Sequence, residues 1–508
     1  MADPRIAAQP RVGLRSPTGD DPLTSVPVRR VDDDKAALHV RLFGTHEFFR
    51  LWLAQVVAAL GDWLGFLGIT ILAASVGLGG DGAASAGAAV GLVMIARIVP
   101  GFFLAPVAGV MVDRWDRKRV MVACNLGRAA VVATLPWVDS VLGLVVASFL
   151  LEVGALLFSP AKEASVPNLV PPDRLTTANS LSLVAAYGTF PIASLLFALL
   201  AGVAAWLGNI DALGFLELNR TALAFYIQGL TFVVSALLIA TLPLWSPRVG
   251  VRPERDDDAD GADDQPSRRI VWGATFRELK EGWRYVFINP IVRSVNVGLA
   301  IGLVGGGMVV PLGSVFSIAV LGAGAAGFGL FVTALGFGVA GGVIALSVLQ
   351  SRIDKVRIFT LSLLVAGASL IGAASVSSLA PALALVFVLG TGAGGVYVLG
   401  FTLLHENTDD ELRGRTFSAL YTLVRLCLLI AFAVGPFMAE LLDDLSARLF
   451  GDRRVEVFGV EVFLPGVRLT LFLAGLLVLA GGVVTGMSLR AGHIGRRADE
   501  ATASESGE

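Results

Sequence analysis

The chain has 508 residues, of which 55% are hydrophobic and only 16% are charged, and its mean hydropathy is +0.75. This balance is far more apolar than that of soluble globular proteins, so it excludes the soluble classes and indicates a membrane protein. The net charge of −2 says little about partners, because the charged residues gather in short segments between long apolar runs.

The chain begins with a polar segment, residues 1–47, which lacks an apolar core and is predicted to be a disordered tail rather than a signal peptide. Runs of about 20 apolar residues follow, the length that a helix needs to cross a bilayer. We predict two six-helix bundles, 48–243 and 291–490, joined by a polar linker, 244–290, and followed by a disordered tail, 491–508. The predicted membrane helices are 50–77, 86–112, 120–138, 141–160, 179–207, 221–243, 291–320, 323–350, 358–378, 380–404, 416–442 and 468–489.

One part of the linker is expected to fold. In residues 274–287, ATFRELKEGWRYVF, Thr275 and Glu278 form a capping-box pattern, and the apolar residues that follow recur at helical spacing. Basic residues lie between them. The pattern predicts an amphipathic helix on the inner surface of the membrane.

The lysines and arginines predict the orientation of the chain. With the N-terminus placed inside and the helices alternating, 31 of the 39 basic residues fall in inner segments and 5 in outer segments. Because short cytoplasmic loops are rich in basic residues, both termini are expected to be cytoplasmic. The other three, Arg97, Arg128 and Arg425, lie within helices.

Between the second and third helices, six charged residues fill the seven positions from Asp113 to Arg119. A similar turn follows the eighth helix, at an offset of 238 residues. It places Arg352, Asp354, Lys355 and Arg357 opposite Arg114, Asp116, Arg117 and Arg119. Residues 174–183 and 411–420 are also similar, at an offset of 237. Two similarities at nearly one offset indicate a duplicated six-helix unit.

The first turn resembles the signature of the major facilitator superfamily, which is a glycine, three residues, Asp-Arg and a basic cluster. The matching residues are Gly109, Asp113, Arg114, Arg117, Lys118 and Arg119. Asp116 stands where glycine is frequent, as in the drug and macrolide-efflux and siderophore-exporter branch. Residues 159–188 are similar to the transporter half of actinobacterial chains fused to a thymidylate kinase. No GxxxxGK[ST] phosphate loop occurs in the chain, so no kinase activity is expected.

The resemblance covers residues 48–490 and implies two bundles that rock about a central site. It also implies that Asp113 holds the second helix against the eleventh, while the arginines pair within the loop as a cytoplasmic gate. Gly109 would allow the backbones to approach closely. The alternative is that the turn only anchors the topology of the chain.

Five charged residues, Asp62, Arg97, Arg128, Glu152 and Arg425, lie inside the predicted helices. Each costs at least about 2.5 kcal/mol at the centre of a membrane helix, so each needs a partner or water. The sequence leaves two interpretations open. The charges are either internal ion pairs that fix helix packing, or functional groups. In the functional interpretation, Asp62 and Glu152 are candidates for proton coupling, and the three arginines are candidates for contact with an anionic substrate group.

Together these features predict an all-α secondary transporter, a proton-coupled exporter of small amphipathic, drug- or macrolide-like molecules. We expect a monomer in the bacterial plasma membrane, whose partners are the substrate, protons and lipid, without nucleic acid. No catalytic residue, cofactor or metal site is expected, and His405 and Glu406 are interpreted as solvated residues at the inner end of a helix. The alternatives are import, transport of lipids or metabolites, and a non-transporting scaffold or sensor. The fifth predicted helix lacks the Gly-Pro motif of many exporters, so the direction of transport stays open.

Overall fold

The computed structural model describes residues 43–79, 83–208, 210, 221–243, 284, 286–349, 354–408, 410–457 and 460–505. Within these residues, twelve helical segments are long and apolar enough to cross a membrane, as predicted. The helices of the first half are α2 (His46–Leu78), α3 (Ala83–Arg114), α4 (Arg117–Thr134), α5 (Val141–Ser165), α6 (Leu175–Tyr187), α7 (Phe190–Leu207) and α9 (Ala222–Ala240). Those of the second half are α11 (Pro290–Gly307), α12 (Val309–Ala319), α13 (Gly324–Leu349), α14 (Lys355–Ser375), α15 (Leu379–Glu406), α16 (Asp410–Phe450) and α17 (Gly466–Glu505).

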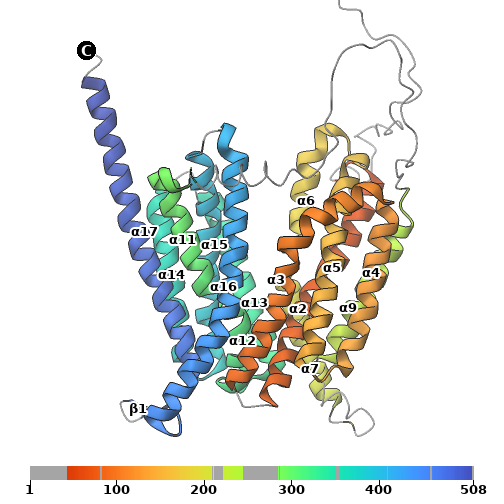
Figure 1. Cartoon of the computed structure of the whole chain (residues 1–508), viewed down its shortest axis with the longest axis horizontal. Helices are drawn as coiled ribbons and strands as arrows, with labels where there is room; N and C mark the ends of the chain where they lie inside the picture. The colour runs from red at the N-terminus through yellow and green to blue at the C-terminus, as the bar shows by residue number, and fades with distance from the viewer. Residues whose placement is uncertain are drawn as a thin grey trace, which may run out of the picture.

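The helices form two bundles, which Figure 1 shows side by side. In the N-terminal bundle α2 packs on α9, α3 on α5, and α4 on both α5 and α9. In the C-terminal bundle α13 and α14 pack on α15, and α17 packs on α11 and α14. We call the end of the molecule that carries the α3–α4 turn the turn end. The opposite end is the hairpin end, where an antiparallel pair of strands, β1 (Arg454–Val457) and β2 (Val460–Phe463), joins α16 to α17.

The two bundles contact each other mainly where α3 meets α16 and where α7 meets α13, with further contacts of α12 with α2 and α3 and of α17 with α3. A Cβ added to Gly91 of α3 would lie 2.7 Å from the carbonyl oxygen of Phe432 on α16. A Cβ added to Gly329 of α13 would lie 2.9 Å from the backbone of Ala198 on α7. These glycines allow helix backbones to touch. Both contacts lie in the halves of the helices nearest the hairpin end, where the ribbons of the two bundles converge (Figure 1).

Two of the predicted membrane helices are each divided in two. The fifth ends as α6 at Tyr187 and resumes as α7 at Phe190, where Pro191 occupies the first turn. The seventh is divided into α11 and α12 at Met308, directly after three glycines. Proline cannot donate a backbone hydrogen bond and glycine is a weak helix former, which accounts for breaks at these positions.

The ends of several elements differ from the sequence prediction. α16 continues to Phe450 rather than 442, and α17 runs to Glu505, through most of the tail expected to be disordered at 491–508. The extension of α16 contains Leu, Ala and Arg, and that of α17 is rich in Ala with Arg and Glu, all of which are strong helix formers. Both extensions prolong existing helices, so no new nucleation is needed. At the other end, Thr45 caps α2 by accepting a hydrogen bond from the backbone N–H of Phe48. The described structure therefore includes residues 43–47 of the segment that was expected to be a disordered tail.

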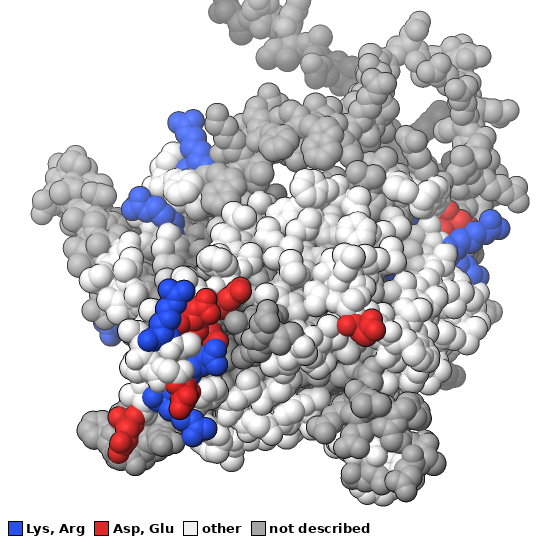
Figure 2. All heavy atoms as spheres, turned by 60° about the horizontal axis from the view of Figure 1, so that its bottom comes forward, with Lys and Arg blue, Asp and Glu red and all other residues white. Residues whose placement is uncertain are grey.

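The strand pair was not predicted from the sequence. Arg468, which is fully buried, donates hydrogen bonds to the carbonyl of Val376 and the hydroxyl of Ser377 in the α14–α15 connection. Asp443 of α16 forms an ion pair with Arg453, 2.9 Å between Oδ2 and Nη2. Buried polar contacts therefore stabilise the hairpin end of the C-terminal bundle. Figure 2 shows charged side chains gathered in one part of this end, on a surface that is otherwise largely uncharged.

The predicted amphipathic helix at 274–287 lies almost entirely outside the described residues. Large apolar side chains are exposed along many helices, for example Leu142, Leu199 and Ile344. A surface of this kind suits contact with lipid rather than water.

Candidate functional site

The five predicted membrane charges are connected by one ion pair and by electrostatic interactions, one of which joins the two bundles. Asp62 lies on α2, Arg97 on α3, Arg128 on α4 and Glu152 on α5, and Arg425 lies on α16 of the other bundle. Glu152 interacts electrostatically with all three arginines, and Arg128 forms an ion pair with Asp62. The fold therefore brings together all five residues, which we call the charge centre.

Asp62 and Arg128 form the direct ion pair of the charge centre. Only 3% of the Arg128 side chain is exposed, and its guanidinium donates a hydrogen bond to the Asp62 carboxylate. The guanidinium also lies over the ring of Phe232 on α9, 4.1 Å from the ring centroid. Gly154 of α5 makes room for the arginine stem, because a Cβ there would lie 2.7 Å from Cγ of Arg128. The ion pair joins α2 and α4, and the other contacts of Arg128 reach α9 and α5.

Glu152 has a different environment from Asp62. Within the described part of the chain, its half-buried carboxylate makes no ion pair within 4 Å and no hydrogen bond. Its interactions with Arg97, Arg128 and Arg425 act at longer range. Its protonation would therefore break no direct contact that holds the bundle together, whereas protonation of Asp62 would leave Arg128 buried without its partner.

The other two arginines are less constrained than Arg128. Arg97 is half-buried, and its guanidinium lies 5.6 Å from the ring centroid of Phe66 on α2. Arg425 is exposed although it lies within a membrane span. Because an exposed cation requires water and Glu152 of the other bundle is within electrostatic reach, Arg425 faces the space between the bundles.

An aromatic cluster, which sequence reasoning missed, also joins residues of the two bundles. It consists of Tyr187 on α6, Tyr397 and Phe401 on α15, and Tyr421 on α16. The three tyrosines are 56–66% exposed, and Tyr397 interacts electrostatically with the other two. Phe401 contacts Tyr397, with ring centroids 4.7 Å apart. The chain has only five tyrosines, so their presence in apolar runs is the signal that would have drawn attention to them.

Buried polar residues around the charge centre were also missed. Asn125, one turn before Arg128, donates to the hydroxyl of Ser235 on α9, which in turn donates to the carbonyl of Ala54 on α2. Gln228 of α9 is buried as well. These contacts join the same helices as the ion pair, and each residue is a single polar position in an apolar run.

The basic turn makes contacts that differ from the expected pairing within the loop. Arg117 donates to the carbonyl of Ala164 in the last turn of α5, and Lys118 donates to the carbonyl of Leu242 just after α9. Carbonyls at helix C-termini lack intrahelical partners and attract cations, which explains why these two side chains bind there. Asp116 caps α4, because its carboxylate accepts the backbone N–H of Arg119.

For Asp113, Arg114 and Gly109 of the predicted gate, the structure gives fewer contacts. The side chains of Asp113 and Arg114 lie outside the described set. Among the described residues, a Cβ added to Gly109 would meet nothing within 4 Å, so the described part of the chain shows no close backbone approach at this glycine.

The turn at the start of α14 repeats the capping arrangement. Asp354 accepts hydrogen bonds from the backbone N–H groups of Val356 and Arg357, and it stands 238 residues after the cap Asp116. Lys355 forms an ion pair with Glu406 at the end of α15. Both His405 and Glu406 are exposed, as expected. Among the described residues, no group of three or more His, Cys, Asp or Glu side chains is arranged to hold a metal.

Twelve membrane-crossing helices in two bundles, with charged groups that interact within and between the bundles, define a multi-pass membrane transporter. The sequence model of the Major Facilitator Superfamily matches residues 51–436, and the chain belongs to this family. A transporter of the same type from Mycobacterium tuberculosis is 27% identical over 439 residues, which cover 83% of this chain and 89% of the relative. One from Bacillus subtilis is 31% identical over 134 residues, 26% of this chain and 31% of that protein.

Solved structures show the same fold. A bacterial homologue of the human lysosomal transporter Spinster, in an inward-facing and unoccupied conformation, superposes with a TM-score of 0.65 at 16% identity. The match covers 88% of this chain and 98% of that chain. A bacterial homologue of the iron transporter ferroportin, in an inward-facing state, gives a TM-score of 0.57 at 14% identity, covering 87% and 98%.

Proposed function

We propose that the protein is a proton-coupled exporter of small amphipathic molecules, in which Glu152 binds the driving proton. The observation that carries this proposal is the contrast between the two carboxylates of the charge centre. Asp62 is held in an ion pair by the buried Arg128, whereas Glu152 has no direct partner among the described residues and lies near Arg97 and Arg425. Of the two candidates for coupling, Glu152 is therefore favoured, and Asp62 is assigned a structural role.

Alternating access gives a physical route from proton binding to transport. Glu152 belongs to one bundle and Arg425 to the other, so rocking of the bundles changes the distance between them. A carboxylate that loses a cationic neighbour binds a proton more readily. Because the described contacts between bundles lie toward the hairpin end, we propose that this conformation is open at the turn end. Closing the turn end would then alter the proton occupancy of Glu152.

The arginines and the aromatic cluster suggest the kind of substrate. Arg425 is exposed, and Tyr421 lies one helical turn before it on α16. A guanidinium binds carboxylate or phosphate groups, and aromatic rings bind apolar bodies. We propose that Arg425, with Arg97, contacts an anionic or polar group of the substrate while the tyrosines contact its apolar part. Arg128 is less available because it is buried in the ion pair.

The membrane topology follows from the positive-inside pattern. We propose that the turn end and both termini are cytoplasmic, that the protein is a monomer in the plasma membrane of a bacterium, and that the basic turn is a gate. Cysteines introduced near Asp257, which lies outside the described residues, and near Asp452 test this topology. Impermeant reagents should label the first only from inside and the second only from outside. Labelling of both from one side would exclude the arrangement.

The gate is tested at Asp113. We expect Asp113→Asn to reduce transport far more than it reduces folded protein in the membrane, because the charge biases one of two conformations by a few kcal/mol. Transport per folded molecule that stays unchanged would instead identify the turn as a topological anchor.

The coupling proposal is tested with a matched pair of variants, Glu152→Gln and Asp62→Asn. Each would be reconstituted in liposomes and measured for pH-driven transport of a panel of amphipathic dyes and for exchange without a gradient. Because an amide mimics a protonated carboxyl, we expect Glu152→Gln to lose pH-driven transport while exchange and thermal stability persist. Asp62→Asn should lose stability and both transport modes together. Normal pH-driven transport by folded Glu152→Gln would contradict the assignment.

Import is a second candidate direction, since the fifth span carries a break at Gly188 and Pro191 in place of the Gly-Pro motif of many exporters. The same liposomes can distinguish the two directions if the pH gradient is imposed with either sign. A proton-coupled exporter moves dye in the direction opposite to the proton flow. A proton symporter moves dye in the same direction as the protons.

A further inference from the structure

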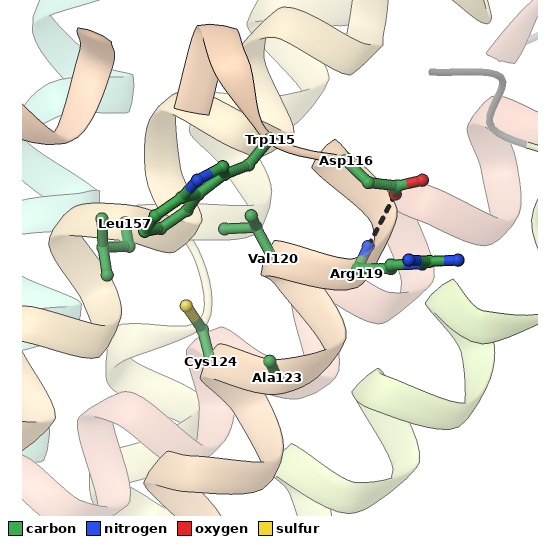
Figure 3. A pocket seen from close by; sticks show the side chains of 7 residues that line it. All are labelled: Trp115, Asp116, Arg119, Val120, Ala123, Cys124 and Leu157. Carbon is green, nitrogen blue, oxygen red and sulfur yellow. Dashed lines mark hydrogen bonds between the residues drawn. The ribbon is translucent and has the colours of Figure 1, made fainter. Parts of the chain in front are cut away.

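A pocket opens on the surface of the N-terminal bundle, at the turn end and apart from the charge centre. It has a volume of about 520 Å³, within the usual range for ligand pockets. Its lining residues are Trp115, Asp116, Arg119, Val120, Ala123, Cys124 and Leu157. Figure 3 shows the ring of Trp115 beside Leu157 at one side of the pocket, Val120, Ala123 and Cys124 along α4, and Asp116 and Arg119 at the other side. The pocket is thus amphipathic, with charged residues on one side and apolar residues elsewhere.

The charges at the pocket include one cation that has no partner among the described residues. Arg117 and Lys118 are bound to helix C-terminal carbonyls. Arg119 is exposed, and its guanidinium makes no hydrogen bond or ion pair within the described part of the chain. The Asp116 carboxylate accepts the backbone N–H of Arg119 instead of its side chain. A free guanidinium at the border of an apolar pocket is suited to an anion that carries an apolar chain.

The second half of the chain provides an internal comparison. Arg357 stands at the position equivalent to Arg119, 238 residues later. Its Nε forms an ion pair with Oδ2 of Asp354 at 3.0 Å. The same Asp-to-Arg spacing therefore gives a paired arginine in the C-terminal bundle and an unpaired one beside the pocket. Among the described residues, Arg119 therefore has no internal partner, whereas Arg357 has the exposed carboxylate of Asp354.

The pocket also lies where a membrane lipid would reach it. Val120, Ala123 and Cys124 belong to the first turns of a membrane span, so they lie just inside the apolar layer. Trp115 precedes that span and is 49% exposed, and tryptophan is enriched at the level of lipid headgroups. The basic residues predict that this end of the molecule faces the cytoplasm, where anionic lipids are attracted to basic segments.

We propose that this pocket binds an anionic phospholipid of the inner leaflet. The lipid phosphate contacts the guanidinium of Arg119, and one acyl chain lies along Val120, Ala123 and Cys124 with Trp115 beside it. This site is separate from the proposed substrate site, and the proposal does not depend on proton coupling or on the direction of transport.

Quenching of Trp115 fluorescence by brominated lipids tests the proposal. The full chain would be placed in phosphatidylcholine nanodiscs that contain a small share of acyl-brominated phosphatidylglycerol or, separately, acyl-brominated phosphatidylcholine. The chain has eight tryptophans, so the Trp115 signal is the difference between wild type and Trp115→Phe. We expect at least twofold stronger quenching of this signal by the brominated phosphatidylglycerol. Equal quenching by both lipids would show ordinary lipid contact and overturn the proposal.

Three variants locate the effect. Arg119→Gln should abolish the preference for phosphatidylglycerol, and Arg119→Lys should retain most of it. Arg357→Gln, which removes the equivalent cation from the other bundle, should leave it unchanged. A preference that persists in Arg119→Gln, or that Arg357→Gln removes equally, would contradict a specific site. Ala123→Phe provides an independent test at an exposed position, because a ring there should fill the pocket and lower quenching by either lipid.

Discussion

The two bundles use glycine in different ways. In the N-terminal bundle, glycines make room for side chains. A Cβ on Gly61 of α2 would collide with the hydroxyl of Thr231, and one on Gly154 would press against the stem of Arg128. In the C-terminal bundle, the glycines between α13 and α15 bring backbone against backbone. A Cβ on Gly342 would collide with the carbonyl of Thr391.

This difference accompanies a difference in charge. Four of the five residues of the charge centre belong to the N-terminal bundle, and its helices are joined by the Asp62–Arg128 ion pair and by the hydrogen bonds of Asn125 and Ser235. The ion pair Lys355–Glu406 of the C-terminal bundle lies at a helix end, with 28% and 47% of the side chains exposed. Buried polar contacts join the helices of the first bundle around the charge centre, whereas in the second bundle the buried polar contacts of Arg468 and Asp443 lie at the hairpin end and close glycine packing joins α13 and α15. Most charged residues of the charge centre therefore lie in the N-terminal bundle. The C-terminal bundle contributes Arg425 and the closely packed helices α13 and α15.

The largest expected effect comes from breaking the buried ion pair. Asp62→Asn leaves the Arg128 guanidinium buried without a counter-charge, which we expect to cost about 3 kcal/mol, the low end of the range for buried pairs because Asp62 is itself partly exposed. The control, Lys355→Gln, breaks an exposed pair and should cost about 0.2–1 kcal/mol. Thermal unfolding of both variants in detergent measures the contrast. Equal losses would mean that the two bundles are not held differently.

A smaller effect is expected at neighbouring glycines of α13. Gly342→Ala places a Cβ against the carbonyl of Thr391 and should destabilise the protein by about 1–3 kcal/mol through overpacking. Gly341→Ala is its matched control, because a Cβ at Gly341 would meet nothing within 4 Å. There alanine should be neutral or stabilise by up to about 1 kcal/mol through its better helix propensity.

Both alanine variants would be compared by thermal unfolding and by disulfide crosslinking of cysteines placed on α13 and α15. Reduced crosslinking in Gly342→Ala alone would confirm that the glycine sets the helix separation. If both variants behave alike, helix propensity rather than backbone contact decides the stability of this pair.

The sequence predicted the membrane spans well, because the bilayer requires about 20 apolar residues and this requirement is local. It also singled out Asp62, Arg128 and Glu152, since a charge in an apolar run is conspicuous. It did not reveal which carboxylate Arg128 binds, because that choice depends on the rotation of four helices and on the space left by Gly154. The distinction between a paired Asp62 and an unpaired Glu152 comes from the packing alone.

Other features escaped prediction for a related reason. The apolar run ends at 442, where the predicted membrane helix was ended, yet α16 continues to Phe450, since leaving the membrane does not require a helix to end. Its extension is fixed by contacts distant in sequence, such as the hydrogen bond from the Gly466 N–H to the carboxylate of Asp443. The aromatic cluster likewise joins residues from α6, α15 and α16, which no local pattern connects.

The smallest expected effects concern the feature that the two bundles share, the aspartate caps of α4 and α14. Asp116→Ala and Asp354→Ala each remove a side-chain acceptor from the first turn and should each cost about 1 kcal/mol. Asp354→Ala should cost a few tenths of a kcal/mol more, because it also removes the exposed ion pair with Arg357. Asparagine can still cap the helix, so Asp354→Asn should lose only the few tenths of a kcal/mol that the ion pair with Arg357 contributes.

Hydrogen exchange of the backbone N–H groups separates these contributions, since each cap protects specific amides. Loss of Asp116 should expose the N–H of Arg119, and loss of Asp354 should expose those of Val356 and Arg357. Exchange elsewhere in each bundle should remain as in the wild type, because each cap contacts only the first turn of its helix. If instead the Asp116 variant loosens the whole N-terminal bundle while the Asp354 variant stays local, the two turns are not equivalent. The difference between the bundles would then extend from their interiors to the capped turn that both bundles contain.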